Sequence, residues 1–177
     1  MPGFFSNAQK TVFKIDDYDY AEAVDITTGF KVREFIRNAG GVSYSPYVVK
    51  DGERPDTVAF KVYDDPTLDW TVLLANGIQN IYDEWPKDSE TFKDYIIEKY
   101  GSLESAMATI KYYYNAEGLI INADDYATLP ATGKRTESAY QYEVRLNINK
   151  SKIRLFTPTI AKSMSSLLRN IDKKPLK

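Results

Sequence analysis

The clearest pattern of hydrophobic and polar positions lies between residues 44 and 102. The apolar run Tyr47–Val49 ends at the turn-forming pair Asp51-Gly52, which predicts a short strand followed by a tight turn. Pro55 suits the first turn of a helix, and apolar residues at i, i+1, i+4 and i+5 give that helix one buried face. We therefore predict a strand that leads into a short helix.

A second helix is predicted directly after the first. Asp65 is placed to cap it, Pro66 occupies its first turn and Gly77 ends it. The apolar side chains on the inner faces of the two helices form the expected core of a strand-helix-helix module: Val58, Tyr63, Trp70, Leu73 and Leu74.

Helical and extended patterns alternate after residue 86. Caps at Asp88 or Ser89 and at Ser102 predict two further helices, ending at Gly101 and near Thr109. Two loops are predicted, an aromatic one over 78–86 and a second over 123–136, and residues 111–114 and 119–122 are predicted to form a β-hairpin. The segment 140–148 fits a strand or a helix. It is followed by a predicted strand over 153–156 and a final helix over 158–171.

Residues 1–40 show no helical or strand period over any long window. Thr11–Ile15 fits a short strand, and Phe30–Arg37 fits a strand or one or two helical turns. We interpret this part as an extended arm that depends on partners. The predicted fold class is α+β, divided into an arm over 1–43, the central module with its following helix over 44–102, and a hairpin, loop and C-terminal strand-helix region over 103–177.

Composition argues against several classes of function. The chain has 23 Lys and Arg against 25 Asp and Glu, without the basic excess typical of nucleic-acid binding. It has no cysteine and no histidine, and it lacks the GxxxxGK[ST], GxGxxG and GxSxG motifs. No signal peptide is recognisable, and the longest apolar runs are too short to span a bilayer. We expect a soluble protein without enzyme activity, metal, organic cofactor or membrane partner.

Five short motifs carry a resemblance to a known family. They are Gly52-Glu53-Arg54-Pro55, Tyr63, Trp70 with Leu73 and Asn76, Asp83-Glu84-Trp85-Pro86, and Lys99-Tyr100-Gly101-Ser102. Residues 44–102, where these motifs lie, resemble a LysM-type module and, more narrowly, the baseplate wedge protein 53 family of T4-type contractile-tailed phages. The resemblance to this family extends to the tail, where a short strand at Ile153-Arg154-Leu155 leads into a helix. The resemblance implies a virion subunit, made in the host cytoplasm, that holds neighbouring wedge proteins together in the sixfold baseplate around the tail hub.

The sequence departs from an ordinary LysM module after the second predicted helix. A glycan-binding LysM module closes there with a second strand, whereas here Asp83 to Pro86 leads into another helix. A closing strand must come from elsewhere in the chain or be missing. The alternative function is a LysM-like module that binds peptidoglycan or chitin-type sugars. A peptidoglycan hydrolase is a third, weaker hypothesis, because histidine and catalytic motifs are absent.

An assembly role directs attention to aromatic and apolar side chains that could contact partners. The chain has 14 Tyr, 8 Phe and 2 Trp, and large aromatic side chains are well suited to protein interfaces. Trp85 fits a lid over the core as well as an interface anchor, and the final helix could pack on the chain itself or on a neighbouring subunit. The candidate interface residues are Tyr82, Trp85, Tyr113, Ile160, Met164 and Leu168.

The departure from the LysM pattern predicts that the chain does not bind sugars. Isothermal titration with N-acetylglucosamine oligomers should give no saturable heat at sub-millimolar concentrations. A saturating isotherm in that range would favour the sugar-binding alternative.

Overall fold

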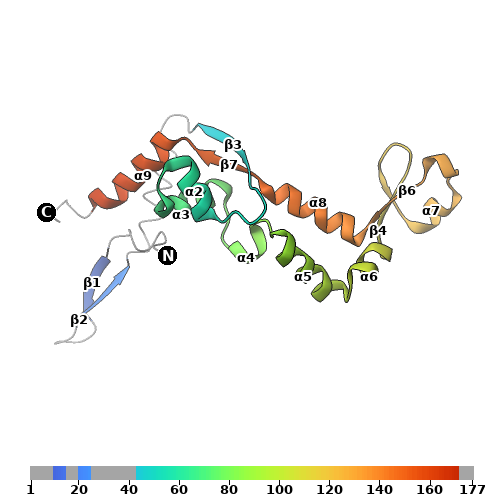
Figure 1. The fold of residues 1–177 in the computed structure, drawn as a ribbon, viewed down its shortest axis with the longest axis horizontal. Helices are drawn as coiled ribbons and strands as arrows, with labels where there is room; N and C mark the ends of the chain where they lie inside the picture. The colour runs from blue at the N-terminus through green and yellow to red at the C-terminus, as the bar shows by residue number, and fades with distance from the viewer. Residues whose placement is uncertain (1–9, 15–19, 25–42, 172–177) are drawn as a thin grey trace. The chain divides into compact units, whose positions relative to one another are not determined.

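The structure is a computed structural model that describes residues 10–14, 20–24 and 43–171 (Figure 1). These residues form an α+β structure, as predicted. They divide into two compact units. Unit 1 contains the described residues up to Val48, together with Glu53–Gln79 and the described residues from Ile153 onward. Unit 2 contains Val49–Gly52 and Asn80–Lys152.

The first described element is an antiparallel hairpin. It consists of β1 (Lys10–Lys14) and β2 (Tyr20–Val24), in which Lys10 pairs with Val24. β1 covers most of the strand predicted at Thr11–Ile15, while β2 was not predicted. The element predicted at Phe30–Arg37 lies outside the described residues.

The centre of unit 1 follows the predicted strand-helix-helix order. Pro55 begins the first helix, and Gly77 ends the second with a left-handed φ of 68°. Asp65 accepts a hydrogen bond from the Thr67 amide, but it caps a 3-10 turn that precedes the second α-helix. The elements of unit 1 are β3 (Tyr44–Val48), α2 (Pro55–Tyr63), η2 (Pro66–Leu68), α3 (Asp69–Asn76), β7 (Lys152–Phe156) and α9 (Pro158–Ile171).

The buried residues of α2 and α3 overlap with the predicted module core. Val58, Tyr63 and Trp70 are buried, whereas Leu73 and Leu74 are half-buried. α3 also buries Thr71, Val72 and Ala75. A polarity pattern does not favour Thr71 as a core position. Its hydroxyl nevertheless donates to the Leu68 carbonyl at 2.7 Å, so the buried Thr71 hydroxyl has a hydrogen-bond partner.

The strand that closes unit 1 is β7, which pairs with β3. The Thr157 amide donates to the Ser43 carbonyl at 3.3 Å, and the Val49 amide donates to the Ser151 carbonyl at 2.9 Å. Both bonds fit one antiparallel register, which turns the backbone of Pro46 away from β7. Proline is tolerated there because an outward-facing residue needs no N–H for the ladder.

The other edge of β7 is closed by side chains of the two helices. The Asn76 amide group donates to the Arg154 carbonyl at 2.9 Å, and its oxygen accepts from the Arg154 amide at 3.0 Å. The Tyr63 hydroxyl donates to the Phe156 carbonyl at 3.1 Å, and burial raises the pKa of this hydroxyl. β7 is therefore bonded on both edges, to β3 on one and to α2 and α3 on the other.

Unit 2 corrects two predictions and decides between the alternatives of a third. The predicted loop over 78–86 contains α4, the predicted loop over 123–136 contains α7, η3 and the start of β6, and the ambiguous segment 140–148 is helical. A capping box between Ser138 and Gln141 begins that last helix. The predicted hairpin is confirmed, because Tyr114 pairs with Ile120. The elements of unit 2 are α4 (Ile81–Glu84), α5 (Ser89–Tyr100), α6 (Leu103–Ala108), β4 (Ile110–Tyr114), β5 (Ile120–Ile121), α7 (Ala123–Thr128), η3 (Ala131–Gly133), β6 (Arg135–Ser138) and α8 (Ala139–Ser151).

A buried carboxylate joins α5 to α8 within unit 2. Glu143 of α8 accepts hydrogen bonds from Lys99 at 2.8 Å, Tyr100 at 2.9 Å and Tyr95 at 3.2 Å. Burial opposes ionisation of Glu143, yet these hydrogen bonds hold its pKa below the ordinary value of 4.5. The same interaction raises the pKa of Lys99 above its ordinary range. Two residues of the Lys99-Tyr100-Gly101-Ser102 motif thus anchor α5 on α8.

Replacement of Asn76 tests how firmly β7 is held. Asn76→Ala removes both hydrogen bonds to Arg154 and should lower the free energy of unfolding by about 1–3 kcal/mol. Urea denaturation followed by circular dichroism measures this change. The exposed Asn149 serves as the control, and Asn149→Ala should be neutral. Equal stability of the two variants would show that Asn76 does not hold the strand.

Glu143 predicts how stability depends on pH. Because its folded pKa lies below 4.5, its contribution is complete above pH 4.5 and is lost as the pH falls through the lowered folded value. Lys99, with a raised folded pKa, contributes below pH 10.5 and loses its contribution as the pH rises through the raised value.

Glu143→Gln should therefore lower the free energy of unfolding at pH 7 by about 1–3 kcal/mol. The loss should shrink as the pH falls below 4.5, because the unfolded wild-type chain then binds a proton on Glu143 that the folded chain binds only at lower pH. Chemical denaturation across this pH range gives the comparison. A difference that stays constant with pH would contradict the ionised network.

Candidate protein-binding surface

The structure separates the predicted interface residues by exposure. Tyr82 on α4 is 82% exposed, whereas Trp85, which follows α4, is buried. Tyr113 is half-buried, with its ring centroid 4.7 Å from that of Tyr126. On α9, Ile160 is half-buried and Met164 is fully buried within the chain itself, and the side chain of Leu168 lies outside the described residues. Among these residues, Tyr82 presents the largest fraction of its surface to a partner.

Local hydrogen bonds fix the backbone under Tyr82. The Asn80 side chain accepts from the Tyr82 amide at 3.0 Å and caps α4. Lys87 donates to the Tyr82 carbonyl at 2.8 Å, and Lys150 of α8 donates to the Asp83 carbonyl at 2.5 Å. The ring therefore projects from a short helix that is held at both ends, which reduces the entropy it loses on binding.

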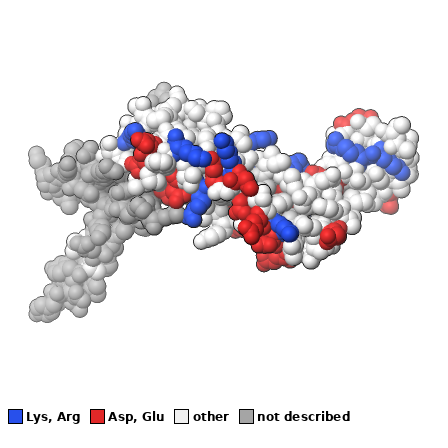
Figure 2. Space-filling view, viewed as in Figure 1, with Lys and Arg blue, Asp and Glu red and all other residues white. Residues whose placement is uncertain are grey.

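A hollow of about 430 Å³ lies beside Tyr82 within unit 2. Figure 2 shows Asp and Glu side chains gathered over α4 and α5, and Lys and Arg side chains in a band over the end of unit 2 that carries its sheet. The two regions differ in charge, and this difference is relevant to partner choice. The hollow is lined by Ile81, Tyr82, Asp83, Trp85, Pro86, Lys87, Asp88, Thr91, Asp94, Tyr95 and Glu98.

Several tyrosine rings near the sheet of unit 2 lie under cations. Arg135 lies 4.4 Å from the ring centroid of Tyr114, and Lys134 lies 5.2 Å from that of Tyr126. The Tyr142 ring has Lys111 at 5.2 Å and Arg145 at 5.3 Å. Tyrosine and arginine are the residue types that contribute most strongly to binding at protein interfaces.

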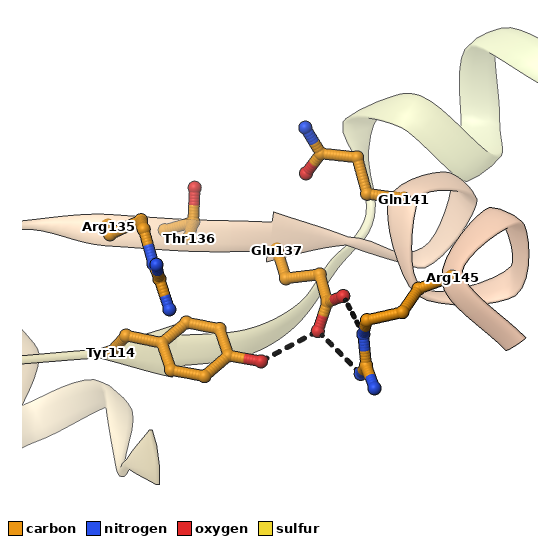
Figure 3. A pocket seen from close by; sticks show the side chains of 6 residues that line it. All are labelled: Tyr114, Arg135, Thr136, Glu137, Gln141 and Arg145. Atoms are coloured by element: carbon orange, nitrogen blue, oxygen red, sulfur yellow. Dashed lines mark hydrogen bonds and ion pairs between the residues drawn. The ribbon is translucent and has the colours of Figure 1, made fainter. Parts of the chain in front are cut away.

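A second pocket, of about 410 Å³, lies where β6 meets α8 (Figure 3). Glu137 accepts two hydrogen bonds from Arg145, at 2.7 and 3.0 Å, and one from the Tyr114 hydroxyl at 2.7 Å. The hydrogen bonds from Arg145 hold the pKa of Glu137 below its ordinary value, and the hydrogen bond to Glu137 raises the pKa of Tyr114. The Glu137 carboxylate is therefore held in place and ionised, and the donors of Arg145 and Tyr114 that surround it are already bonded to it.

Arg135 differs from Arg145 in its bonding. Its guanidinium stacks on the Tyr114 ring but forms no hydrogen bond or ion pair with any residue that the structure describes. A guanidinium carries five N–H donors in a planar fork that matches a carboxylate. The pocket therefore combines a carboxylate fixed by Arg145 and Tyr114 with an arginine that forms no hydrogen bond to the described residues, although its charge also helps to lower the pKa of Glu137.

Within residues 10–14, 20–24 and 43–171, no group of three or more Asp or Glu side chains could hold a metal ion. The carboxylate in the pocket of Figure 3 is engaged by Arg145 and Tyr114. In the same part of the chain, no helix is long and apolar enough to cross a membrane.

Arg135, Glu137 and Arg145 were not among the candidate residues predicted from the sequence. The first lies in the segment predicted as a loop, and the other two lie in or beside the ambiguous one. The signal available was the short run of alternating residues after Gly133, in which Arg135 and Glu137 share one face.

Comparison with known proteins identifies a family. A family model described as base plate wedge protein 53 matches residues 5–129. No curated protein matches the chain. The matched range includes Tyr82 and Tyr114, whereas β6 and α8 follow it.

Proposed function

This chain belongs to the base plate wedge protein 53 family, and on that basis we propose that it holds neighbouring wedge proteins together during assembly of the sixfold baseplate. The family has a structural role in the phage baseplate, which places the protein in the virion tail and supports a function without catalysis. The proposed partners are other wedge proteins around the tail hub. The proposed mechanism is the burial of preformed surface.

The exposure of Tyr82 on a fixed backbone is the observation that supports this proposal most strongly. A side chain with 82% of its surface in water has no packing role of its own, yet three hydrogen bonds hold the backbone of α4 around it. Exposed aromatic residues on a rigid element are typical anchors of protein interfaces. We therefore assign Tyr82 as an anchor that inserts into a wedge partner, with the neighbouring hollow receiving a side chain of that partner.

Strand order alone does not separate a wedge subunit from a LysM-like sugar-binding module. β7 supplies the closing strand that the sugar-binding alternative also needs. The family match favours the wedge role, because the matched family is named for the baseplate and not for a carbohydrate. The region between α3 and β7, where a LysM module has only a connection, is occupied by unit 2.

The proposal is tested by reconstitution with co-expressed wedge proteins from the same phage. The wild-type chain should co-purify in a defined complex by size exclusion and native mass spectrometry. Tyr82→Ala should weaken its incorporation about thirtyfold or more, the effect expected for loss of an aromatic anchor. Its melting temperature should match that of the wild type, because the side chain contributes little to the core.

Lys93→Ala is the matched control, because Lys93 is an exposed residue of the same unit. This variant should join the complex as the wild type does. A wild-type chain that never enters a wedge complex would contradict the proposed function. Normal incorporation of Tyr82→Ala would contradict only the assignment of the anchor.

A further inference from the structure

The three-stranded sheet of unit 2 has an open edge. Its strand order is β5-β4-β6, so β6 is a terminal strand. Among the described residues no strand pairs with the far side of β6, and Arg135 and Thr136 are exposed. Terminal strands with free backbone groups can accept an extended segment from another protein.

The ladder determines which backbone groups of β6 face outward. The Asn115 amide donates to the Leu119 carbonyl at 3.0 Å, so alternate residues of β4, including Tyr113, bond towards β5. Tyr112 and Tyr114 therefore bond towards β6, where they pair with Glu137 and Arg135.

Thr136 lies between those two pairs in β6, so its N–H and C=O point away from β4. Neither group has a hydrogen-bond partner among the residues that the structure describes. One residue of an added antiparallel strand could satisfy both groups, because paired residues exchange two hydrogen bonds. The neighbouring Ser138 amide is not available, because it donates to the Gln141 side chain at 2.9 Å.

The charge next to this edge favours one type of incoming segment. Arg135 immediately precedes Thr136, and its guanidinium stacks on Tyr114 without forming a hydrogen bond or ion pair to a described residue. The nearby Glu137 is neutralised by Arg145, so it does not repel an acidic group as a bare carboxylate would. A carboxylate that reached Arg135 would form a charge-assisted pair supported by the aromatic ring.

We propose that the free edge of β6 pairs with a short extended segment of a wedge partner, and that an acidic side chain of this segment binds Arg135. This inference rests on the proposed function, since it names the chemistry of one wedge contact. Backbone pairing through Thr136 supplies the geometry, and the pairing with Arg135 supplies the preference for an acidic residue.

Substitution at Thr136 tests the edge in the reconstituted wedge complex. Thr136→Pro removes the outward N–H but leaves the ladder to β4 intact, because the Thr136 N–H takes no part in it. Incorporation should fall at least tenfold, whereas Thr136→Ala, which keeps the N–H, should join normally. Circular dichroism of both variants checks that unit 2 remains folded.

Hydrogen exchange of the wild-type chain provides a measurement that needs no variant. The Thr136 amide should exchange rapidly in the free chain and become protected in the complex. Absence of protection over residues 135–137, or normal incorporation of Thr136→Pro, would overturn the edge pairing. Failure of the wild-type chain to join the complex would instead contradict the proposed function, and this contact with it.

Two further outcomes identify the occupant of the edge. Arg135→Gln should reduce incorporation about tenfold or more, and the deficit should shrink at high salt. If Arg135→Gln joined the complex as the wild type does, the segment would not be recognised through an acidic group. Self-association of the free chain that Thr136→Pro abolishes would assign the edge to a second copy and overturn the wedge partner.

Discussion

The pairing of β3 with β7 is the constraint on which unit 1 depends. The side chain of Asn76 bonds to both the N–H and the C=O of Arg154, which lies 78 positions later in the sequence. Unit 2 occupies most of that interval. Closing a flexible loop of that length costs entropy that grows with the logarithm of its length. A folded unit 2 reduces this cost, because the hydrogen bond from Lys150 to the Asp83 carbonyl holds the two ends of its Asn80–Lys152 segment together. Burial of Ile153, Leu155 and Phe156 then stabilises the closed sheet.

Carboxylates that accept from a tyrosine and a cation recur through the chain. In unit 1, the buried Glu53 binds the Tyr47 hydroxyl of β3 and Lys61 of α2, which ties the strand to the helix. In unit 2, Glu143 does the same for α5 and α8. A buried charge costs free energy unless it is paired and hydrogen-bonded, so these groups fix the geometry of their elements. Glu137 repeats the pattern near the surface, where it leaves Arg135 available for a partner.

The sequence predicted elements well where local signals decide them. Pro55, Asp88, Gly77 and Gly101 mark helix ends, and these ends lie where local capping chemistry places them. The helix at 139–151 was ambiguous because the apolar residues of 140–148 fit both periods, and the capping box that decides it begins at Ser138, before that segment. The strand over 153–156 was predicted, but its pairing with β3 was not, since no local signal identifies which distant strands pair. Exposure separates Tyr82 from Trp85, although the two aromatic residues lie close together in sequence.

Native-state hydrogen exchange of the full chain, followed by nuclear magnetic resonance, tests most directly whether β7 is an integral part of unit 1. The Arg154 amide bonds to Asn76, and the Val58 amide bonds within unit 1 to the Arg54 carbonyl at 2.9 Å. If β7 is integral to unit 1, the two amides should exchange with the same opening free energy and the same denaturant dependence. Rapid exchange at Arg154 together with slow exchange at Val58 would show that unit 1 folds without β7. It would contradict the dependence of unit 1 on the pairing of β3 with β7.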